Sequence, residues 1–122
     1  MKISLTEKRR LGSSGLKASP LCLGTMMFGS RTDEQESRAI IEHAYGAGVN
    51  FIDTADVYNK GISEEIVSRA IGPNRSEWVL ASKVGNPMGE GPHQRGLSHK
   101  WMLEAIECSL DRLKTNYLDI WY

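Results

Sequence analysis

The sequence predicts an α/β fold with a parallel sheet, and three observations lead to this prediction. Short apolar segments of strand length alternate with amphipathic segments of helix length between residues 21 and 122. Glycine, proline or a capping residue separates each segment from the next. Regular alternation of strands and helices is typical of parallel sheets with right-handed crossovers. The predicted order is a hairpin, followed by four strands that three helices connect.

The first predicted elements are a hairpin, a strand and a helix. Glycine and serine supply a tight turn at Leu11–Leu16, between two short strands. The first main strand is expected at residues 21–28, and Thr32 is predicted to cap the first helix. This helix is expected to end near residue 47, because Gly48 suits the left-handed position that follows a helix. Its predicted buried stripe consists of Ala39, Ile40, Ala44 and Ala47.

The remaining elements continue the same alternation. The later strands are expected at residues 50–55, 78–84 and 117–122. Ser63 is predicted to cap the second helix, which Gly72-Pro73 ends. Ser98 is predicted to cap the third helix. The predicted apolar stripe of that helix consists of Met102, Ile106, Leu110 and Leu113.

The fourth strand is apolar and has nothing after it to cover it, and four parallel strands leave two open edges. An eight-stranded α/β barrel takes about 250 residues, roughly twice the length of this chain. We therefore expect residues 1–122 to form the N-terminal half of one barrel domain. Residues 1–20 would be an N-terminal segment with the hairpin, and residues 21–122 the first four strands. Such a half barrel is expected to pair with a second copy or with a C-terminal half.

Composition excludes several function classes. Fifteen basic and fifteen acidic side chains give a formal net charge of zero, so we expect neither a nucleic-acid nor a membrane partner. Cys22 and Cys108 lie in apolar segments and are predicted to be buried, reduced thiols, which favours a cytoplasmic location. The three histidines, His43, His93 and His99, have no metal-ligand spacing, so no metal site is predicted.

Three polar residues lie where apolar strands end, and they define a candidate site. Asp53 closes the second strand, Tyr58 follows five residues later, and Lys83 closes the third strand. Because parallel strands gather their C-terminal ends at one edge, these side chains are expected to lie close together. A nearby ammonium favours the phenolate form of a tyrosine, which can then exchange protons. The alternatives are a solvated lysine and a loop aromatic that packs on a strand end.

A glycine in the first strand adds a second candidate feature. In Gly24-Thr25-Met26, the glycine permits either close packing or the approach of a flat ligand to the backbone.

Several stretches together resemble one known family, the aldo-keto reductases, in the branch that includes potassium-channel β subunits and microbial reductases. These stretches are Leu23–Met26, Gly48–Tyr58, Ala81–Val84, Gly96–Ser98 and Tyr117–Tyr122.

The resemblance implies a (β/α)8 TIM barrel that uses NADPH to reduce aldehydes or ketones to alcohols. By the same resemblance, Tyr58 is the proton donor to the carbonyl oxygen, Lys83 tunes it, and Asp53 is the partner of Lys83. Asp53 also corresponds to a position near the nicotinamide ribose. The other positions that line the cofactor in the family are matched by Thr25, Met26 and Arg31.

The family's fourth catalytic residue, a histidine, follows the fourth-strand aspartate by five residues. Counting from Asp119 places it two residues past Tyr122. The second half of the family's barrel supplies most contacts to the cofactor's pyrophosphate and adenosine. The chain is therefore expected to be the N-terminal piece of a longer reductase, or else a non-catalytic half-barrel module or regulatory β-subunit-like protein. In either case, these residues alone should bind NADPH weakly and turn over little, and they do not specify the substrate.

Overall fold

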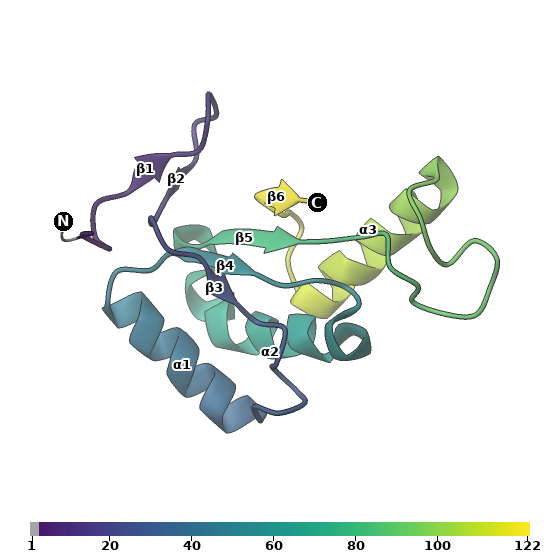
Figure 1. The fold of residues 1–122 in the computed structure, drawn as a ribbon, viewed down its shortest axis with the longest axis horizontal. Helices are drawn as coiled ribbons and strands as arrows, with labels where there is room; N and C mark the ends of the chain where they lie inside the picture. Colours follow the sequence, from purple (N-terminus) through teal and green to yellow (C-terminus); the bar gives the residue numbers. More distant parts are fainter. Residues whose placement is uncertain (1–2) are drawn as a thin grey trace.

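The structure, a computed structural model that describes residues 3–122, has the predicted α/β architecture (Figure 1). Strands β1 (Arg9–Arg10) and β2 (Lys17–Ala18) form an antiparallel hairpin. The main sheet is parallel, with the strand order β3-β4-β5-β6. Its strands are β3 (Leu23–Gly24), β4 (Phe51–Asp53), β5 (Val79–Ser82) and β6 (Ile120–Trp121).

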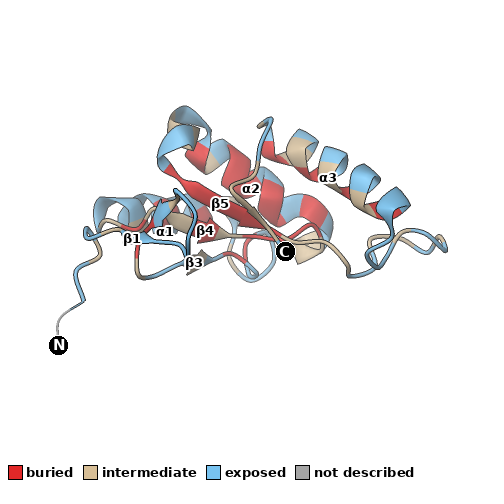
Figure 2. Ribbon diagram, turned by 90° about the horizontal axis from the view of Figure 1, so that it is seen from above, coloured by how far each residue is buried: buried red, intermediate tan, exposed pale blue. Residues whose placement is uncertain are grey.

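Three α-helices connect these strands in the predicted order. They are α1 (Glu34–Gly46), α2 (Ile62–Ile71) and α3 (His99–Leu113), with 3-10 turns η1 (Tyr58–Gly61) and η2 (Gly72–Glu77) around α2. Helix α2 lies between α1 and α3 and packs against both of them. Figure 2 shows the buried residues concentrated in α2 and in the strands that it covers.

The core lies between the sheet and the helices. Leu23, Ile52 and Leu80 are adjacent across the sheet, and Ile52 and Leu80 have no exposed surface (0%). Successive side chains of a strand point to opposite faces, so the residues directly before and after these three in each strand face away from the helices. The buried hydrophobic cluster consists of Phe28, Ile41, Ile52, Ile66, Val67, Ile71, Trp78, Leu80 and Leu113.

The predicted hairpin and the first helix end are confirmed. The backbone N–H of Leu11 donates to the carbonyl of Leu16 at 2.9 Å, which closes the turn. Gly48 has a φ of +99°, in the left-handed region that the sequence predicted after the helix. The Lys8 ammonium also donates to the carbonyl of Gly48, which ties the segment before the hairpin to the end of α1.

Two predictions for α1 are wrong. Asp33, rather than Thr32, is the cap, because its carboxylate accepts a 2.8 Å hydrogen bond from the N–H of Glu36. The buried positions are Ser37 and Ile41, whereas Ala39, Ile40 and Ala47 are exposed and Ala44 is half-buried. A polar Ser37 is tolerated inside because its hydroxyl donates to the Asp33 carbonyl at 2.6 Å.

The predicted cap of α2 is also wrong, while that of α3 is confirmed. Helix α2 begins at Ile62 after Gly61, and Ser63 is fully buried. Its hydroxyl lies 2.9 Å from Thr25 Oγ1 and 3.0 Å from Thr54 Oγ1, so it joins β3 and β4 instead of capping a helix. Ser98 caps α3 by accepting from the N–H of Trp101 at 3.1 Å.

The buried line of α3 is shifted from its prediction. It runs through Trp101, Ala105, Ser109 and Leu113, while Met102, Ile106 and Leu110 are half-buried. All four strands are shorter than expected, because each extends only over the residues that pair with a neighbouring strand.

The prediction of two buried thiols is wrong, because Cys22 and Cys108 are both exposed and form no disulfide. Cys22 precedes β3 on the side that faces away from the core, and Cys108 lies on the outer side of α3, next to exposed Glu107.

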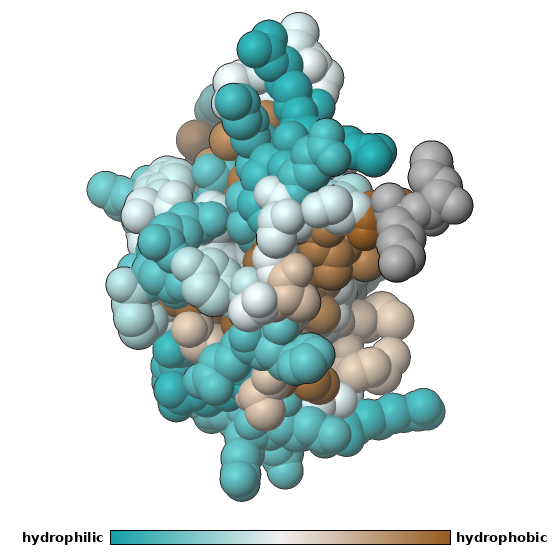
Figure 3. Space-filling model, turned by 90° about the vertical axis from the view of Figure 1, so that its left-hand side faces the viewer, coloured by the Kyte–Doolittle hydropathy of each residue, from teal (hydrophilic) through white to brown (hydrophobic). Residues whose placement is uncertain are grey.

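No helix within residues 3–122 has the length and apolarity needed to cross a membrane. Figure 3 shows a largely hydrophilic face over the side of the molecule seen at the left of Figure 1.

Candidate active site

Strand register places Asp53 and Lys83 on the same face of the sheet. Asp53 is paired with Ala81, and Lys83 lies two residues beyond Ala81 along the chain. Because side chains alternate along a strand, both point away from the helices, whereas Ile52 and Ser82 point toward them. Both residues also lie at the C-terminal ends of their strands, where ligands bind in parallel α/β folds.

The Lys83 ammonium lies at the centre of the site. Its Nζ donates to Asp53 Oδ1 at 2.6 Å, to the phenol oxygen of Tyr58 at 2.9 Å, and to the backbone carbonyl of Thr54 at 2.9 Å. An ammonium has three donors, and all three are used here. The structure therefore brings together the three residues that the sequence predicted as a group, and adds the Thr54 carbonyl.

Partial burial sets the electrostatics of the site. The side chains of Lys83 and Asp53 are 32% and 23% exposed. Burial alone lowers the pKa of Lys83, but the hydrogen bonds with the Asp53 carboxylate and with Tyr58 raise it more, so the net shift is upward. Lys83 therefore remains a cation at neutral pH, and its charge lies beside the phenol oxygen.

Tyr58 is presented by an unusual turn. Asn59, Lys60 and Gly61 follow one another with φ of 49°, 54° and 96°, all in the left-handed region. Non-glycine residues in this region cost about 1–3 kcal/mol each and persist where the surroundings hold them. One such restraint is the Asn59 side-chain amide, which donates to the carbonyl of Phe28 at 2.7 Å.

A small cavity of about 170 Å³ opens beside the ammonium and the phenol. It is formed by the loop after β4 and the segment after β5, so both halves of its wall come from C-terminal strand ends. The lining residues are Ala55, Asp56, Val57, Tyr58, Lys83, Val84, Gly85 and Asn86. A carbonyl group placed here would lie beside the phenol.

The predicted cofactor-lining residues are distributed differently. Thr25 is fully buried, and its hydroxyl donates to the Asp53 carbonyl at 2.9 Å, which couples β3 to the site. Met26 is 55% exposed, and Arg31 is also exposed. The space next to Gly24 is open, because a Cβ added at this residue would meet no atom within 4 Å. Gly24 pairs with Asp53, so this open backbone lies directly beside the site.

Sequence reasoning missed a buried charged pair behind the site. Glu64 of α2 is fully buried and pairs with Arg112 of α3 at 2.6 Å. The available signal was spacing, because Glu64 precedes Val67, Ser68 and Ile71 at helical intervals, and all three are buried.

Near this pair, the Asp56 carboxyl is also buried, with 2% exposed surface. Burial, together with the Glu64 charge, raises its pKa from 3.8 to about 6.

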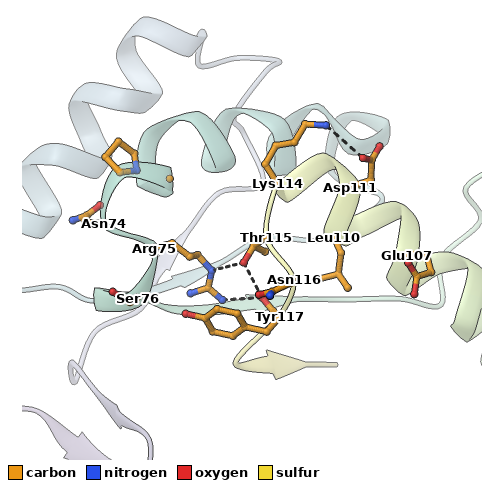
Figure 4. Close-up of a pocket in the computed structure, with 12 residues that line it drawn as sticks. Asn74, Arg75, Ser76, Glu107, Leu110, Asp111, Lys114, Thr115, Asn116 and Tyr117 are labelled. Atoms are coloured by element: carbon orange, nitrogen blue, oxygen red, sulfur yellow. Dashed lines mark hydrogen bonds and ion pairs between the residues drawn. The ribbon is translucent and has the colours of Figure 1, made fainter.

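A larger groove, of about 960 Å³, lies at the opposite end of the strands. Figure 4 shows Arg75 within it, near Thr115 and Tyr117. The Arg75 guanidinium donates to the carbonyl of Tyr117 at 2.9 Å and to the Asp119 carboxylate at 3.0 Å. Asp119 also accepts from the N–H of Leu80 at 2.9 Å, so this cluster attaches the last strand to β5 and has a structural role. Within residues 3–122, no three His, Cys, Asp or Glu side chains are placed to hold a metal ion.

Comparison with known proteins agrees with this geometry. The sequence profile of the Aldo/keto reductase family matches residues 20–122. A probable voltage-gated potassium channel subunit beta of Arabidopsis thaliana is 41% identical over 120 residues, which cover 93% of this chain and 36% of that protein. The uncharacterized oxidoreductase YqkF of Bacillus subtilis is 40% identical over 116 residues, covering 93% of this chain and 37% of that protein.

A solved structure gives the same result. The aldo-keto reductase AKR11C1 from Bacillus halodurans, in its holo form, superposes with a TM-score of 0.85 at 39% identity, covering 95% of this chain and 39% of that one. The chain thus spans less than half the length of these relatives, and its four parallel strands and three helices are part of a TIM barrel. With its profile match, register and barrel topology in agreement, this chain belongs to the aldo/keto reductase family.

Proposed function

We propose that this chain carries part of the active site of an NADPH-dependent oxidoreductase that reduces an aldehyde or ketone to an alcohol. The observation that supports this proposal best is the position of the Lys83 ammonium. It hydrogen-bonds the Tyr58 phenol and the Asp53 carboxylate at the same time, at the C-terminal ends of the strands.

The three side chains have distinct roles in this proposal. Tyr58 donates its phenolic proton to the carbonyl oxygen as negative charge develops there. Lys83 stabilises the negative charge that remains on the phenol oxygen, 2.9 Å away. Asp53 fixes the position of the ammonium through the 2.6 Å hydrogen bond and keeps it charged.

The residues near Asp53 fit a flat cofactor ring. When bound, a nicotinamide supplies the hydride that reduces the carbonyl carbon. The open backbone at Gly24 permits a flat group to approach the sheet beside Asp53. Met26 and Arg31, which follow Gly24 along the chain, are both exposed, and we propose that they also contact the cofactor.

The test is a Tyr58→Phe substitution in the whole protein, with carbonyl-dependent NADPH oxidation as the measurement. Loss of a general acid should lower kcat by about 10²–10⁴-fold. Tyr45→Phe is the matched control, because Tyr45 is an exposed tyrosine that hydrogen-bonds Glu77 outside the site. Equal kcat in the wild type and in Tyr58→Phe would remove Tyr58 from the mechanism.

A second candidate function is that of a regulatory, β-subunit-like protein without turnover. It is favoured by the 41% identity with the plant protein named as a probable channel subunit. Two unpaired thiols agree with a reducing, cytoplasmic location for either function. The two functions differ in one measurement, since a regulatory protein would show no carbonyl-dependent NADPH oxidation in either the wild type or Tyr58→Phe.

A further inference from the structure

A buried ion pair lies behind the site, on the helix side of the sheet. Glu64 has no exposed surface, and its Oε2 accepts a 2.6 Å hydrogen bond from Arg112 Nε. The Arg112 side chain is 19% exposed. A carboxylate without a partner would be strongly unfavourable in such surroundings, so each charge depends on the other.

On one side, the pair is attached to the strand that carries Lys83. Glu64 Oε1 accepts a 2.6 Å hydrogen bond from Ser82 Oγ, and Ser82 is also fully buried. Ser82 immediately precedes Lys83, and their side chains leave the strand on opposite faces. The carboxylate therefore anchors β5 from the helix side at the point where Lys83 leaves it on the other side.

On the other side, the pair contacts the turn that carries Tyr58. A Cβ at Gly61 would lie 2.6 Å from Arg112 Cδ and 2.7 Å from Arg112 Nε, so the arginine packs directly against the Gly61 backbone. Gly61 is the last residue of η1, which Tyr58 begins. A further link runs from the N–H of Asp56 to the carbonyl of Lys83, at 3.3 Å.

We propose that Glu64 and Arg112 are positioning residues that hold the Tyr58 turn and the Lys83 strand at a fixed separation. The pair reaches both segments through direct contacts, Ser82 on one side and Gly61 on the other. Its catalytic consequence rests on the function proposed above, whereas its effect on the Lys83 amine is a property of this chain. The pair touches neither the phenol nor the ammonium, so it acts through the backbone that carries them.

Ser82→Ala is the mildest test, because it removes one hydroxyl and leaves the Glu64–Arg112 pair in place. The measurement is acetylation of the Lys83 amine in the folded chain by acetic anhydride, quantified by mass spectrometry relative to Lys114, which is 73% exposed. A Lys83 amine released from its hydrogen bonds should react about fivefold faster, the ratio expected for loss of one hydrogen bond. Ser82→Thr keeps the hydroxyl and should restore the wild-type ratio.

Two further variants make the result specific. Glu64→Asp keeps the charge next to Arg112 but shortens the reach to Ser82, so it should raise the Lys83 ratio as Ser82→Ala does, and it carries the test if Ser82→Ala does not fold. Ser109→Ala is the matched control, because it removes a buried hydroxyl 3.4 Å from Arg112 that contacts neither segment. An unchanged ratio in Ser82→Ala and Glu64→Asp, or an equal rise in Ser109→Ala, would overturn the proposal.

Turnover distinguishes this inference from the proposed function. In the whole protein, Ser82→Ala should lower kcat about tenfold and change KM by less than about twofold, because misplacement affects the transition state more than binding. A changed Lys83 ratio without any carbonyl-dependent NADPH oxidation would leave the positioning role in place and refute the reductase function. An unchanged ratio in an active enzyme would remove the positioning role alone.

Discussion

At the scale of single residues, Asp56 is a buried carboxyl whose pKa folding raises. It is 2% exposed, its Oδ2 has no hydrogen-bond partner within residues 3–122, and burial near Glu64 raises its pKa from 3.8 to about 6. Because the folded carboxyl has the higher pKa, the folded chain binds more protons than the unfolded chain between these two values. The free energy of unfolding therefore falls as the pH rises through this window.

This linkage gives a prediction for Asp56→Asn. An amide cannot ionise, so near neutral pH the substitution should raise the free energy of unfolding by about 1–3 kcal/mol. Near pH 4 it should have little effect, because the wild-type carboxyl is then protonated in the folded chain. Urea denaturation at both pH values measures the difference. Asp111→Asn, at a position whose side chain is 84% exposed, is the control and should show no such pH dependence.

At the scale of elements, the sequence prediction and the structure differ at the start of α1, in the residue that caps the helix. Thr32 and Asp33 are both capping residue types, and the pattern of the sequence favoured Thr32. In the structure the Asp33 side chain accepts the hydrogen bond from the backbone of the first turn, whereas Thr32 accepts from this turn through its carbonyl. The choice depends on the path of the preceding loop, where Phe28 and Thr32 form an isolated bridge. That path also depends on a contact distant in sequence, since the Asn59 amide donates to the carbonyl of Phe28 at 2.7 Å, and local sequence does not encode such a contact.

The corresponding prediction compares two alanine substitutions. Asp33→Ala should lower the free energy of unfolding by about 1 kcal/mol, the usual cost of losing a cap. Thr32→Ala should change it by less than about 0.5 kcal/mol, because Thr32 accepts its hydrogen bonds through the backbone carbonyl, which alanine keeps. Chemical denaturation with a circular dichroism signal measures both. A larger loss in Thr32→Ala than in Asp33→Ala would contradict the observed cap.

The turn that presents Tyr58 gives a second prediction at this scale. Gly61→Ala places a Cβ at a φ of +96° and within 2.6 Å of Arg112, so it should cost about 1–3 kcal/mol of stability. Gly72→Ala is the matched control, because Gly72 has a helical φ of −49° and open space around it. It should be neutral or stabilise by up to about 1 kcal/mol. Equal thermal denaturation midpoints for the two variants would show that the turn is not held as described.

At the scale of the whole molecule, the order of elements and the parallel sheet follow from the sequence, because alternating periodicity survives any detail of packing. The convergence of Asp53, Tyr58 and Lys83 also follows from their places near strand ends. The buried helix faces did not follow, because serines occupy buried positions on both helices: the Ser37 hydroxyl donates to the Asp33 carbonyl one turn earlier, and the Ser63 hydroxyl contacts those of Thr25 and Thr54. Glu64 and Arg112 were missed for the same reason, as each is acceptable inside only when paired with the other.

The hydrogen bonds that join Lys83 to Asp53 and Tyr58 can be tested by a 15N NMR titration of the Lys83 amine. The titration is carried out on the wild-type chain, on Asp53→Asn and on Tyr58→Phe. The ammonium donates to both partners, so the wild-type pKa should lie above the ordinary value of 10.5. Each substitution should lower it, and Asp53→Asn should lower it more, because it removes a full negative charge. A Lys83 pKa that lies at or below the ordinary value, and that neither substitution alters, would show that the ammonium does not bind these two side chains.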